Sequence, residues 1–182
     1  MTDEEARSIA KNVPVETSLQ IRAEDGDTNS TVSYEILVPR LSNLKLLTLN
    51  GGISITSVEG TIEFETNNGV INLNDMAGDV KGKTRNGVLD VKLSGNRWRG
   101  NGLDVETRNG VINLSMPENY AARVETGTGN GEFKSYISGL SISEDGRNRR
   151  NLININLNGG APVRVVTNNG DVRIRVSTGG GY

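Results

Sequence analysis

A four-residue signature, Thr-x-Asn-Gly, occurs six times in the chain. Successive copies lie 18, 18, 23, 21 and 39 residues apart, measured between their glycines. A period near 20 residues is typical of repeat proteins, in which one supersecondary unit stacks on the next. We expect the signature to form the same corner in every unit, with its Asn and Gly in the left-handed backbone conformation. The corner asparagines are Asn50, Asn68, Asn86, Asn109, Asn130 and Asn169.

Apolar residues recur two positions apart on both sides of each signature. Ile62 and Phe64 precede the second copy, and Ile71 and Leu73 follow it, with polar residues between them. This alternation is typical of strands that bury one face. Each unit is therefore predicted to hold two short strands joined by the corner. Because Asn-Gly also favours hairpins, an antiparallel meander is the alternative.

A column of charged residues favours a solenoid over a meander. In a solenoid, equivalent residues of adjacent coils lie about 4.8 Å apart, so opposite charges attract directly. In a meander they would lie two strands apart, where screening weakens the attraction. Signs mostly alternate at the position three residues before each signature Thr. That position holds, in chain order, Lys45, Glu63, Lys81, Asp104, Glu125 and Arg164.

We therefore predict an all-β fold: a single-stranded β-solenoid (β-helix) with coils of about 18–23 residues. The corner asparagines should form a ladder of side-chain amides. Residues 1–30 are predicted to hold a short helix over 3–12 and a strand, as a cap or a remnant of upstream strands. The solenoid is predicted over 31–178, with a first strand over 31–39 and the strand at Val172 closing the stack. Residues 179–182 are interpreted as a glycine-rich tail.

Composition excludes several classes of chemistry. Cysteine and histidine are both absent, which rules out disulfides, thiolate nucleophiles and Ser-His or Cys-His catalysis. We expect no cofactor and no bound metal. The 20 basic and 22 acidic residues give a net charge of −2, which argues against nucleic acid as a partner. No apolar run approaches the roughly 18 residues needed to span a bilayer, and the acidic N-terminus is unlike a signal peptide.

One loop and one charged segment are candidate binding sites. Trp98 lies between Arg97 and Arg99 in a segment that lengthens its unit. An aromatic ring flanked by arginines can stack on sugars or anchor a protein partner. The alternative is a loop that folds back over a hydrophobic flank. The basic residues of 147–150 are a second candidate, although a solvated loop tip is the favoured interpretation.

Four carboxylates are candidate catalytic groups, because β-helices also host enzymes that act on polysaccharides. Glycoside hydrolysis needs two carboxylates about 5–9.5 Å apart. Asp75, Asp79, Asp90 and Asp104 are the candidates, but turn-forming and exposed positions explain them better. A calcium site at Asn74, Asp75 and Asp79 lacks the repeat that such sites require. We therefore expect no catalytic residues and no metal ligands.

Three segments together carry a family resemblance. They are residues 34–39 (Tyr-Glu-Ile-Leu-Val-Pro), the repeated Asn-Gly-Val-Ile-Asn at 68–72 and 109–113, and residues 169–174. The chain resembles a bacterial adhesin family of domains of unknown function, found in exported or membrane-anchored proteins and related to head-domain adhesins with Gly-Ile-Asn repeats. The resemblance implies a β-helix that is right-handed and an extracytoplasmic location. It implies no catalytic or binding residues.

The function expected from these features is non-enzymatic. We expect an extracytoplasmic adhesin or cell-surface scaffold that binds a protein or glycan partner. A membrane would be reached only through an anchor outside this chain. The alternative is a carbohydrate-active β-helix enzyme or a carbohydrate-binding module, which rests on fold analogy.

Overall fold

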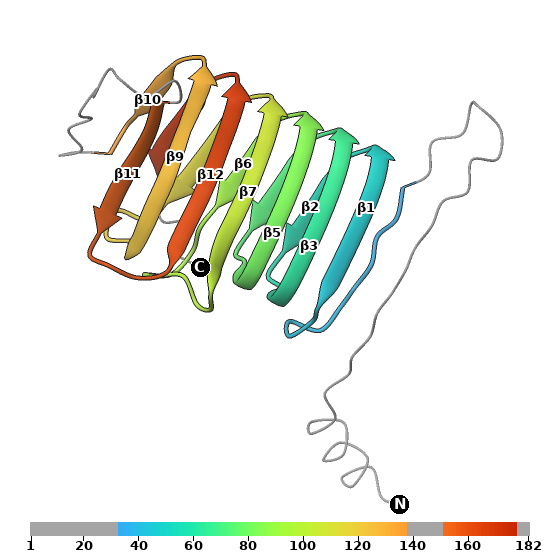
Figure 1. Cartoon of the computed structure of the whole chain (residues 1–182). Helices are drawn as coiled ribbons and strands as arrows, with labels where there is room; N and C mark the ends of the chain where they lie inside the picture. The colour runs from blue at the N-terminus through green and yellow to red at the C-terminus, as the bar shows by residue number, and fades with distance from the viewer. Residues whose placement is uncertain (1–32, 138–150, 178–182) are drawn as a thin grey trace, which may run out of the picture.

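The computed structural model describes residues 33–137 and 151–177, and the regular elements in these residues are all strands. They form a seven-stranded sheet, in the order β1-β3-β5-β7-β12-β9-β11, and a six-stranded sheet, in the order β10-β13-β8-β6-β4-β2 (Figure 1). The seven-stranded sheet contains β1 Leu44–Asn50, β3 Glu59–Asn68, β5 Ala77–Asn86, β7 Gly102–Asn109, β12 Pro162–Asn169, β9 Ala122–Asn130 and β11 Asn151–Leu157. The six-stranded sheet contains β10 Phe133–Ser135, β13 Val172–Val176, β8 Ile112–Met116, β6 Leu89–Lys92, β4 Ile71–Asn74 and β2 Ile53–Thr56.

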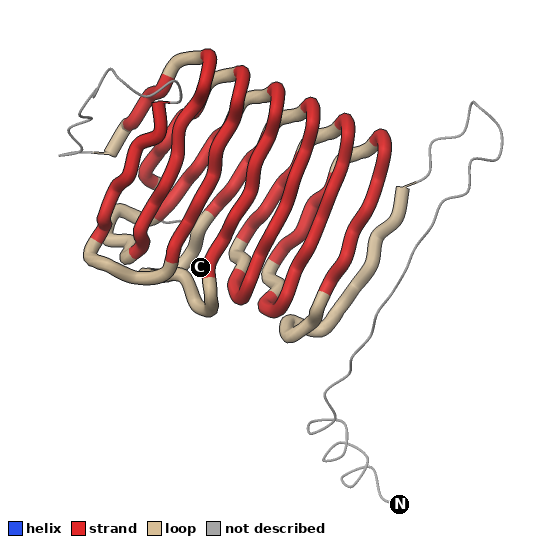
Figure 2. The backbone as a smooth tube through the Cα atoms, in the orientation of Figure 1, coloured by secondary structure: helices blue, strands red, loops and turns tan. Residues whose placement is uncertain are grey.

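Each coil places one strand in each sheet, and the Thr-x-Asn-Gly corner joins the two strands (Figure 2). Equivalent strands of neighbouring coils pair in parallel and in register, so that Leu44 lies opposite Ile62 and Asn50 opposite Asn68. Parallel stacking with this register is the β-solenoid that the sequence predicts, and it rules out the meander. Coil stacking also explains the alternating apolar pattern, because one face of each strand is buried between the sheets.

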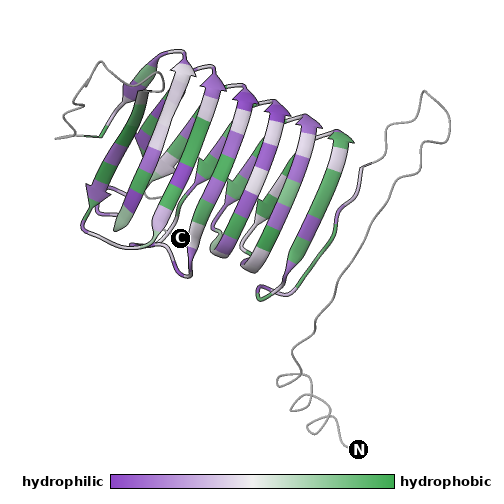
Figure 3. Ribbon diagram, in the orientation of Figure 1, coloured by the Kyte–Doolittle hydropathy of each residue, from purple (hydrophilic) through white to green (hydrophobic). Residues whose placement is uncertain are grey.

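The core is a set of aliphatic rows between the two sheets, and the strands alternate between hydrophobic and polar bands (Figure 3). Ile62, Val80, Leu103 and Val163 form one row and are nearly inaccessible to solvent. Phe64 interrupts the neighbouring row, and its ring occupies the space beside Gly82 on the next coil. A Cβ atom on Gly82 would overlap that ring.

Close packing requires the corner glycines, and four of them (Gly51, Gly69, Gly131 and Gly170) also have a positive φ of 135–159°, which other residues rarely adopt. A Cβ atom on Gly87 would overlap the carbonyl oxygen of Gly69 on the neighbouring coil, and one on Gly110 would overlap that of Gly87. The left-handed conformation predicted for the corners was wrong for their asparagines, since Ser57, Asp75 and Asn158 are the non-glycine residues with positive φ. At the corner, Gly69 N–H donates to the carbonyl of Asn86 on the neighbouring coil at 3.0 Å.

The predicted ladder of asparagine amides is confirmed. Five of the six amides donate from Nδ2 to the Oδ1 atom of the preceding corner in the stack at 2.7–2.8 Å, as Asn68 does to Asn50. The six side chains form one continuous ladder, and a repeated amide ladder stabilises in-register stacking. Its order along the stack is Asn50, Asn68, Asn86, Asn109, Asn169 and Asn130.

The coils do not stack in chain order, so the prediction that the strand at Val172 closes the stack was wrong. The C-terminal coil, β12 and β13, lies between the fourth coil and the coil of β9 and β10. β12 pairs in parallel with both β7 and β9, and β13 with both β8 and β10. β11 pairs antiparallel with the outer edge of β9.

The charged column gives a physical reason for this order. Stacking in chain order would place Asp104 directly against Glu125, and like charges on paired strands repel. Insertion of β12 puts Arg164 between them. Arg164 Nη1 lies 2.6 Å from Asp104 Oδ1, and Nε lies 3.2 Å from Glu125 Oε1. The column then alternates in sign along its whole length.

Four predictions concern the ends of the chain and the segment 147–150. The predicted strand over 31–39 was wrong for residues 33–39, which form no strand: Tyr34 and Ile36 stay exposed, and of the predicted apolar face in these residues only Val38 packs against the core. The predicted helix and strand of 1–30, the basic residues of 147–150 and the tail at 179–182 lie outside the described residues. Within the described residues, no helix is long and apolar enough to span a membrane.

Substitution of Gly82 tests the packing of the core. We expect Gly82→Ala to lower the free energy of unfolding by about 1–3 kcal/mol, because the new methyl group forces the Phe64 ring out of its place. Urea denaturation of Gly82→Ala, Phe64→Leu and the double variant measures the coupling between the two sites. The double variant should lose less than the sum of the single losses; strict additivity would show that the ring and the glycine are not in contact.

Substitution of Arg164 tests the electrostatic reason for the coil order. Arg164→Gln should cost about 1 kcal/mol at low salt, since partly exposed ion pairs are each worth a fraction of that. Lys45→Gln is the matched control: Lys45 is 67% exposed and reaches one partner, Glu63, at 3.7 Å. Thermal unfolding should show almost no loss for the control, and the Arg164 cost should shrink at high salt. Equal costs for the two variants would contradict this account.

Candidate functional site

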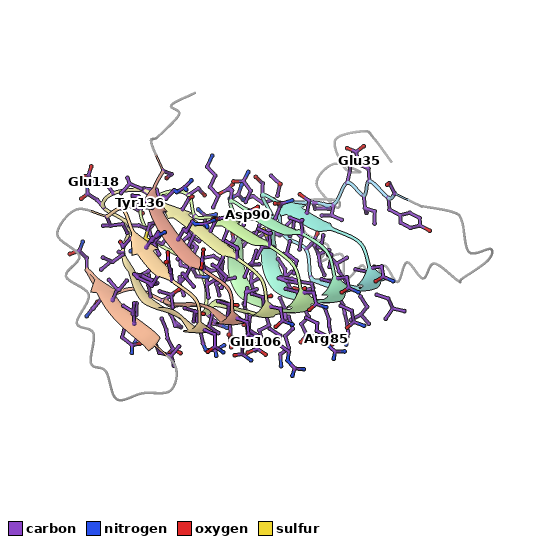
Figure 4. The ribbon with its side chains drawn as sticks, turned by 90° about the horizontal axis from the view of Figure 1, so that it is seen from above. Glu35, Arg85, Asp90, Glu106, Glu118 and Tyr136 are labelled. Carbon is purple, nitrogen blue, oxygen red and sulfur yellow. The ribbon has the colours of Figure 1, made fainter. Side chains whose placement is uncertain are left out.

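The outer face of the seven-stranded sheet is the candidate functional site. Glu106 and Arg85 project from this side of the molecule, whereas Asp90 and Tyr136 project from the opposite side (Figure 4). Alternation along each strand points every second side chain outward, so the face consists of columns that run from coil to coil. The sequence places charged or amide side chains in most of these outward positions.

Two hollows lie on this face. The base hollow, of about 590 Å³, lies near the starts of the strands, and the corner hollow, of about 410 Å³, lies near the Thr-x-Asn-Gly corners. Arg164 lines both. Val166 and Leu152 line the corner hollow, and Val166 is buried although it lies on the outward face. The face is therefore contoured by side chains at its β11 end.

Charges in the base hollow are largely paired. Besides its bonds to Asp104 and Glu125, Arg164 approaches Glu106 Oε2 at 3.6 Å. Lys81 Nζ lies 3.5 Å from Asp79 Oδ2. The hollow is also lined by the amides of Asn101, Asn154 and Asn156, which can donate and accept hydrogen bonds. Its surface therefore offers neutral hydrogen-bonding groups between satisfied ion pairs.

The corner hollow contains two arginines that the sequence analysis did not select. Arg85 and Arg108 occupy the variable position of the signature on the paired strands β5 and β7, and both are exposed. Asn67 and Asn168 occupy the same position on the coils to either side. The signal was present in the signature: aligning its six copies brings the variable residues into one column.

Trp98 does not form an exposed aromatic surface. Its side chain is 4% exposed, belongs to the hydrophobic core and donates from Nε1 to the carbonyl of Gly78 at 3.0 Å. The loop thus folds back over a hydrophobic flank, as the alternative interpretation proposed. A ring buried to this extent cannot stack on a sugar, so the candidate site at Arg97, Trp98 and Arg99 loses its aromatic element. Arg99 is held by Glu59, with Nη2 3.6 Å from Oε2.

The four aspartates weighed as catalytic groups are engaged in structural contacts. Asp79 pairs with Lys81, and Asp104 with Arg164. Asp90 Oδ1 accepts a hydrogen bond from Asn113 Nδ2 at 2.5 Å. Asp79 and Asp104 both line the base hollow, each beside its cation, whereas Asp90 lies on β6 of the other sheet and Asp75 in a turn. In the described part of the chain, no group of three or more carboxylates is placed to hold a metal ion.

Asp75 organises a turn between coils. It has a positive φ of 51°, and its carboxylate accepts hydrogen bonds from Ser94 and from Ser57, the latter at 3.0 Å. Arg40 Nη1 lies 3.5 Å from Oδ2. The hydrogen bond from Ser94, then that from Ser57 and the charge of Arg40, hold the pKa of Asp75 below its ordinary value, against the opposing effect of partial burial.

The outer face of the six-stranded sheet is different in character. At its β10 end, Arg173 Nη2 pairs with Asp171 at 3.0 Å and Lys134 Nζ pairs with Glu132 at 2.6 Å. Arg175 lies over the ring of Tyr136, 5.6 Å from its centroid. These cations are held by near neighbours on the same two coils, and neither of the two hollows lies on this face.

Comparison with known proteins identifies the family. Residues 8–175 match the family model described as Toastrack DUF4097, and the chain belongs to this family. The family is a domain of unknown function, and the stacked parallel coils of this structure make its architecture a β-solenoid. No curated protein and no solved structure matches the chain.

Replacement of Asp75 tests the turn network through pH. A carboxylate whose pKa is lowered in the folded state contributes stability above its unfolded pKa, and this contribution is lost as the pH falls through the folded pKa. Asp75→Asn, which tolerates the positive φ, should therefore unfold at lower urea concentration than the parent at pH 7. The difference should shrink below about pH 4. A difference that stays constant from pH 7 to pH 3 would contradict a charged Asp75.

Proposed function

We propose that this Toastrack domain is a non-enzymatic, extracytoplasmic cell-surface scaffold that binds a protein or glycan partner on the outer face of its seven-stranded sheet. The observation that carries the proposal is the construction of that face. It combines two hollows with columns of polar side chains whose spacing is set by the backbone. Binding surfaces work best when their contacts are held in place before the partner arrives.

Rigidity of the face supports a binding role. The amide ladder and the corner hydrogen bonds fix each coil against the next, from Asn50 to Asn130. The backbone of such a face is ordered before a partner arrives, so binding does not add the cost of ordering a loop. An adhesin role and a location outside the cytoplasm rest on the sequence resemblance to a bacterial adhesin family.

The contacts of the carboxylates support a non-enzymatic role. A hydrolytic pair needs one carboxylate that stays protonated and a second one across a cleft. Here the pKa of Asp75 is lowered, and Asp79 and Asp104 each face a cation. The alternative of a carbohydrate-active enzyme would require one of these groups to leave its partner.

Selective blocking of one face tests the proposal. The chain contains no cysteine, so a single Cys can be modified with a bulky polyethylene glycol maleimide. Glu65→Cys places the group at the corner hollow, and Asn72→Cys places it on the outer face of the six-stranded sheet. We expect the modified Glu65→Cys to lose at least tenfold in binding to glycan arrays or isolated bacterial envelopes, and the modified Asn72→Cys to bind normally.

Three outcomes would contradict the proposed function. Equal binding by both modified proteins, or no binding to arrays and envelopes by the parent chain, would remove the support for a partner-binding face. Release of reducing sugars from an acidic or neutral polysaccharide, abolished by Asp79→Asn or Asp90→Asn, would instead establish the enzyme.

A further inference from the structure

On the outer face of the seven-stranded sheet, the variable position of the signature differs from the two charged columns beside it, in which opposite charges alternate. The column of Arg164 alternates in sign, and in the next column Lys83 lies between Glu65 and Glu106. In the column at the variable position, two arginines lie side by side. It reads, along the stack, Leu49, Asn67, Arg85, Arg108, Asn168 and Gly129.

Arg85 and Arg108 are on neighbouring strands about 4.8 Å apart, where like charges repel. Their own column contains no carboxylate. Among the described residues, no carboxylate lies within ion-pair distance of either guanidinium, whereas Arg40, Arg99, Arg164 and Arg173 each have such a partner. The fold therefore holds two positive charges together without neutralising them.

The nearest carboxylates have other neighbours. Glu106 Oε1 lies 3.4 Å from Lys83 Nζ, and its Oε2 lies 3.6 Å from Arg164. Glu65 lies beside Lys83 in the neighbouring column, one outward position farther from the corner than the two arginines. The arginine side of the corner hollow is therefore the more positive side, and it opens to solvent because both arginines are exposed.

Two amides flank the arginines in the same column. Asn67 lies on the coil beside Arg85, and Asn168 on the coil beside Arg108, and all four side chains line the corner hollow. Guanidinium groups bind oxoanions by paired, charge-assisted hydrogen bonds. Amides both donate and accept hydrogen bonds, as sugar hydroxyls do. The row thus presents a site for an anion with hydroxyl groups on either side of it.

We propose that Arg85 and Arg108 bind the carboxylate or phosphate group of an acidic polysaccharide, and that Asn67 and Asn168 hydrogen-bond the adjoining sugar hydroxyls. This inference rests on the proposed function and names the ligand class of the same face. A polymer suits the row better than a small anion, because the four side chains extend over four consecutive coils. An oligonucleotide suits it less well, because none of the described residues that line the corner hollow is an aromatic residue on which bases could stack.

The test compares two pairs of substitutions that remove the same charge. Arg85→Gln with Arg108→Gln removes the proposed site; Lys92→Gln with Arg97→Gln removes two exposed cations elsewhere. Calorimetric titration of the full chain uses polygalacturonate as the carboxylate polymer, poly(glycerol phosphate) as the phosphate polymer, dextran as the neutral polymer and a single-stranded oligonucleotide. Thermal unfolding checks that all variants fold, which exposed positions permit.

We expect the parent chain to bind at least one of the two acidic polymers and not dextran, with an affinity that falls as salt is raised. The Arg85 and Arg108 variant should lose at least tenfold in affinity, and the control pair less than twofold. The acidic polymer that binds identifies the anion. Equal losses in both variant pairs, tighter binding of the oligonucleotide, or no binding of either acidic polymer would overturn the inference. If neither acidic polymer binds, the proposed function can still be supported. In that case, modification of Glu65→Cys should block binding of the chain to envelopes or to a neutral glycan.

Discussion

Stacking of coils in register, at the spacing of one β-strand, is the constraint on which the whole structure depends. At the corners the backbones approach so closely that a side chain on Gly87 would overlap the carbonyl of Gly69. The same register brings the asparagine amides into hydrogen-bonding distance and aligns the aliphatic rows of the core. Each outward residue consequently has its counterparts on the adjacent coils as neighbours, so the order of the coils determines the chemistry of the surface.

That order is completed by the end of the chain. β12 makes parallel ladders with β7 and β9, and these strands precede it by many residues. β12 therefore lies between β7 and β9 in the sheet, although it is synthesised after both. Long-range parallel pairing of this kind makes folding slow relative to folds with local contacts. Arg164 favours the arrangement, because it separates two acidic residues that stacking in chain order would bring together.

The candidate binding face lies on the regular coils, whereas the loop that resembles a recognition site has a structural role. The loop with Trp98, which has the composition of a recognition site, packs into the core and hydrogen-bonds Gly78. The regular coils, whose repeated residues build the fold, also provide the outer face with its two hollows and its exposed arginines. In a solenoid, residues at outward positions do not pack in the core. Substitutions at these positions can therefore create a ligand site on the repeat without disturbing the fold.

The sequence by itself determined the repeat, the corner, the alternating strands and the amide ladder, because each follows from local periodicity and from the chemistry of Asn and Gly. Aligning the six signatures also places Arg85 and Arg108 at the same position. Only the tertiary structure decided the position of the C-terminal coil and the burial of Trp98. Both depend on contacts between segments far apart in the chain, such as β12 with β7 and Trp98 with Gly78, and local sequence patterns do not encode these contacts.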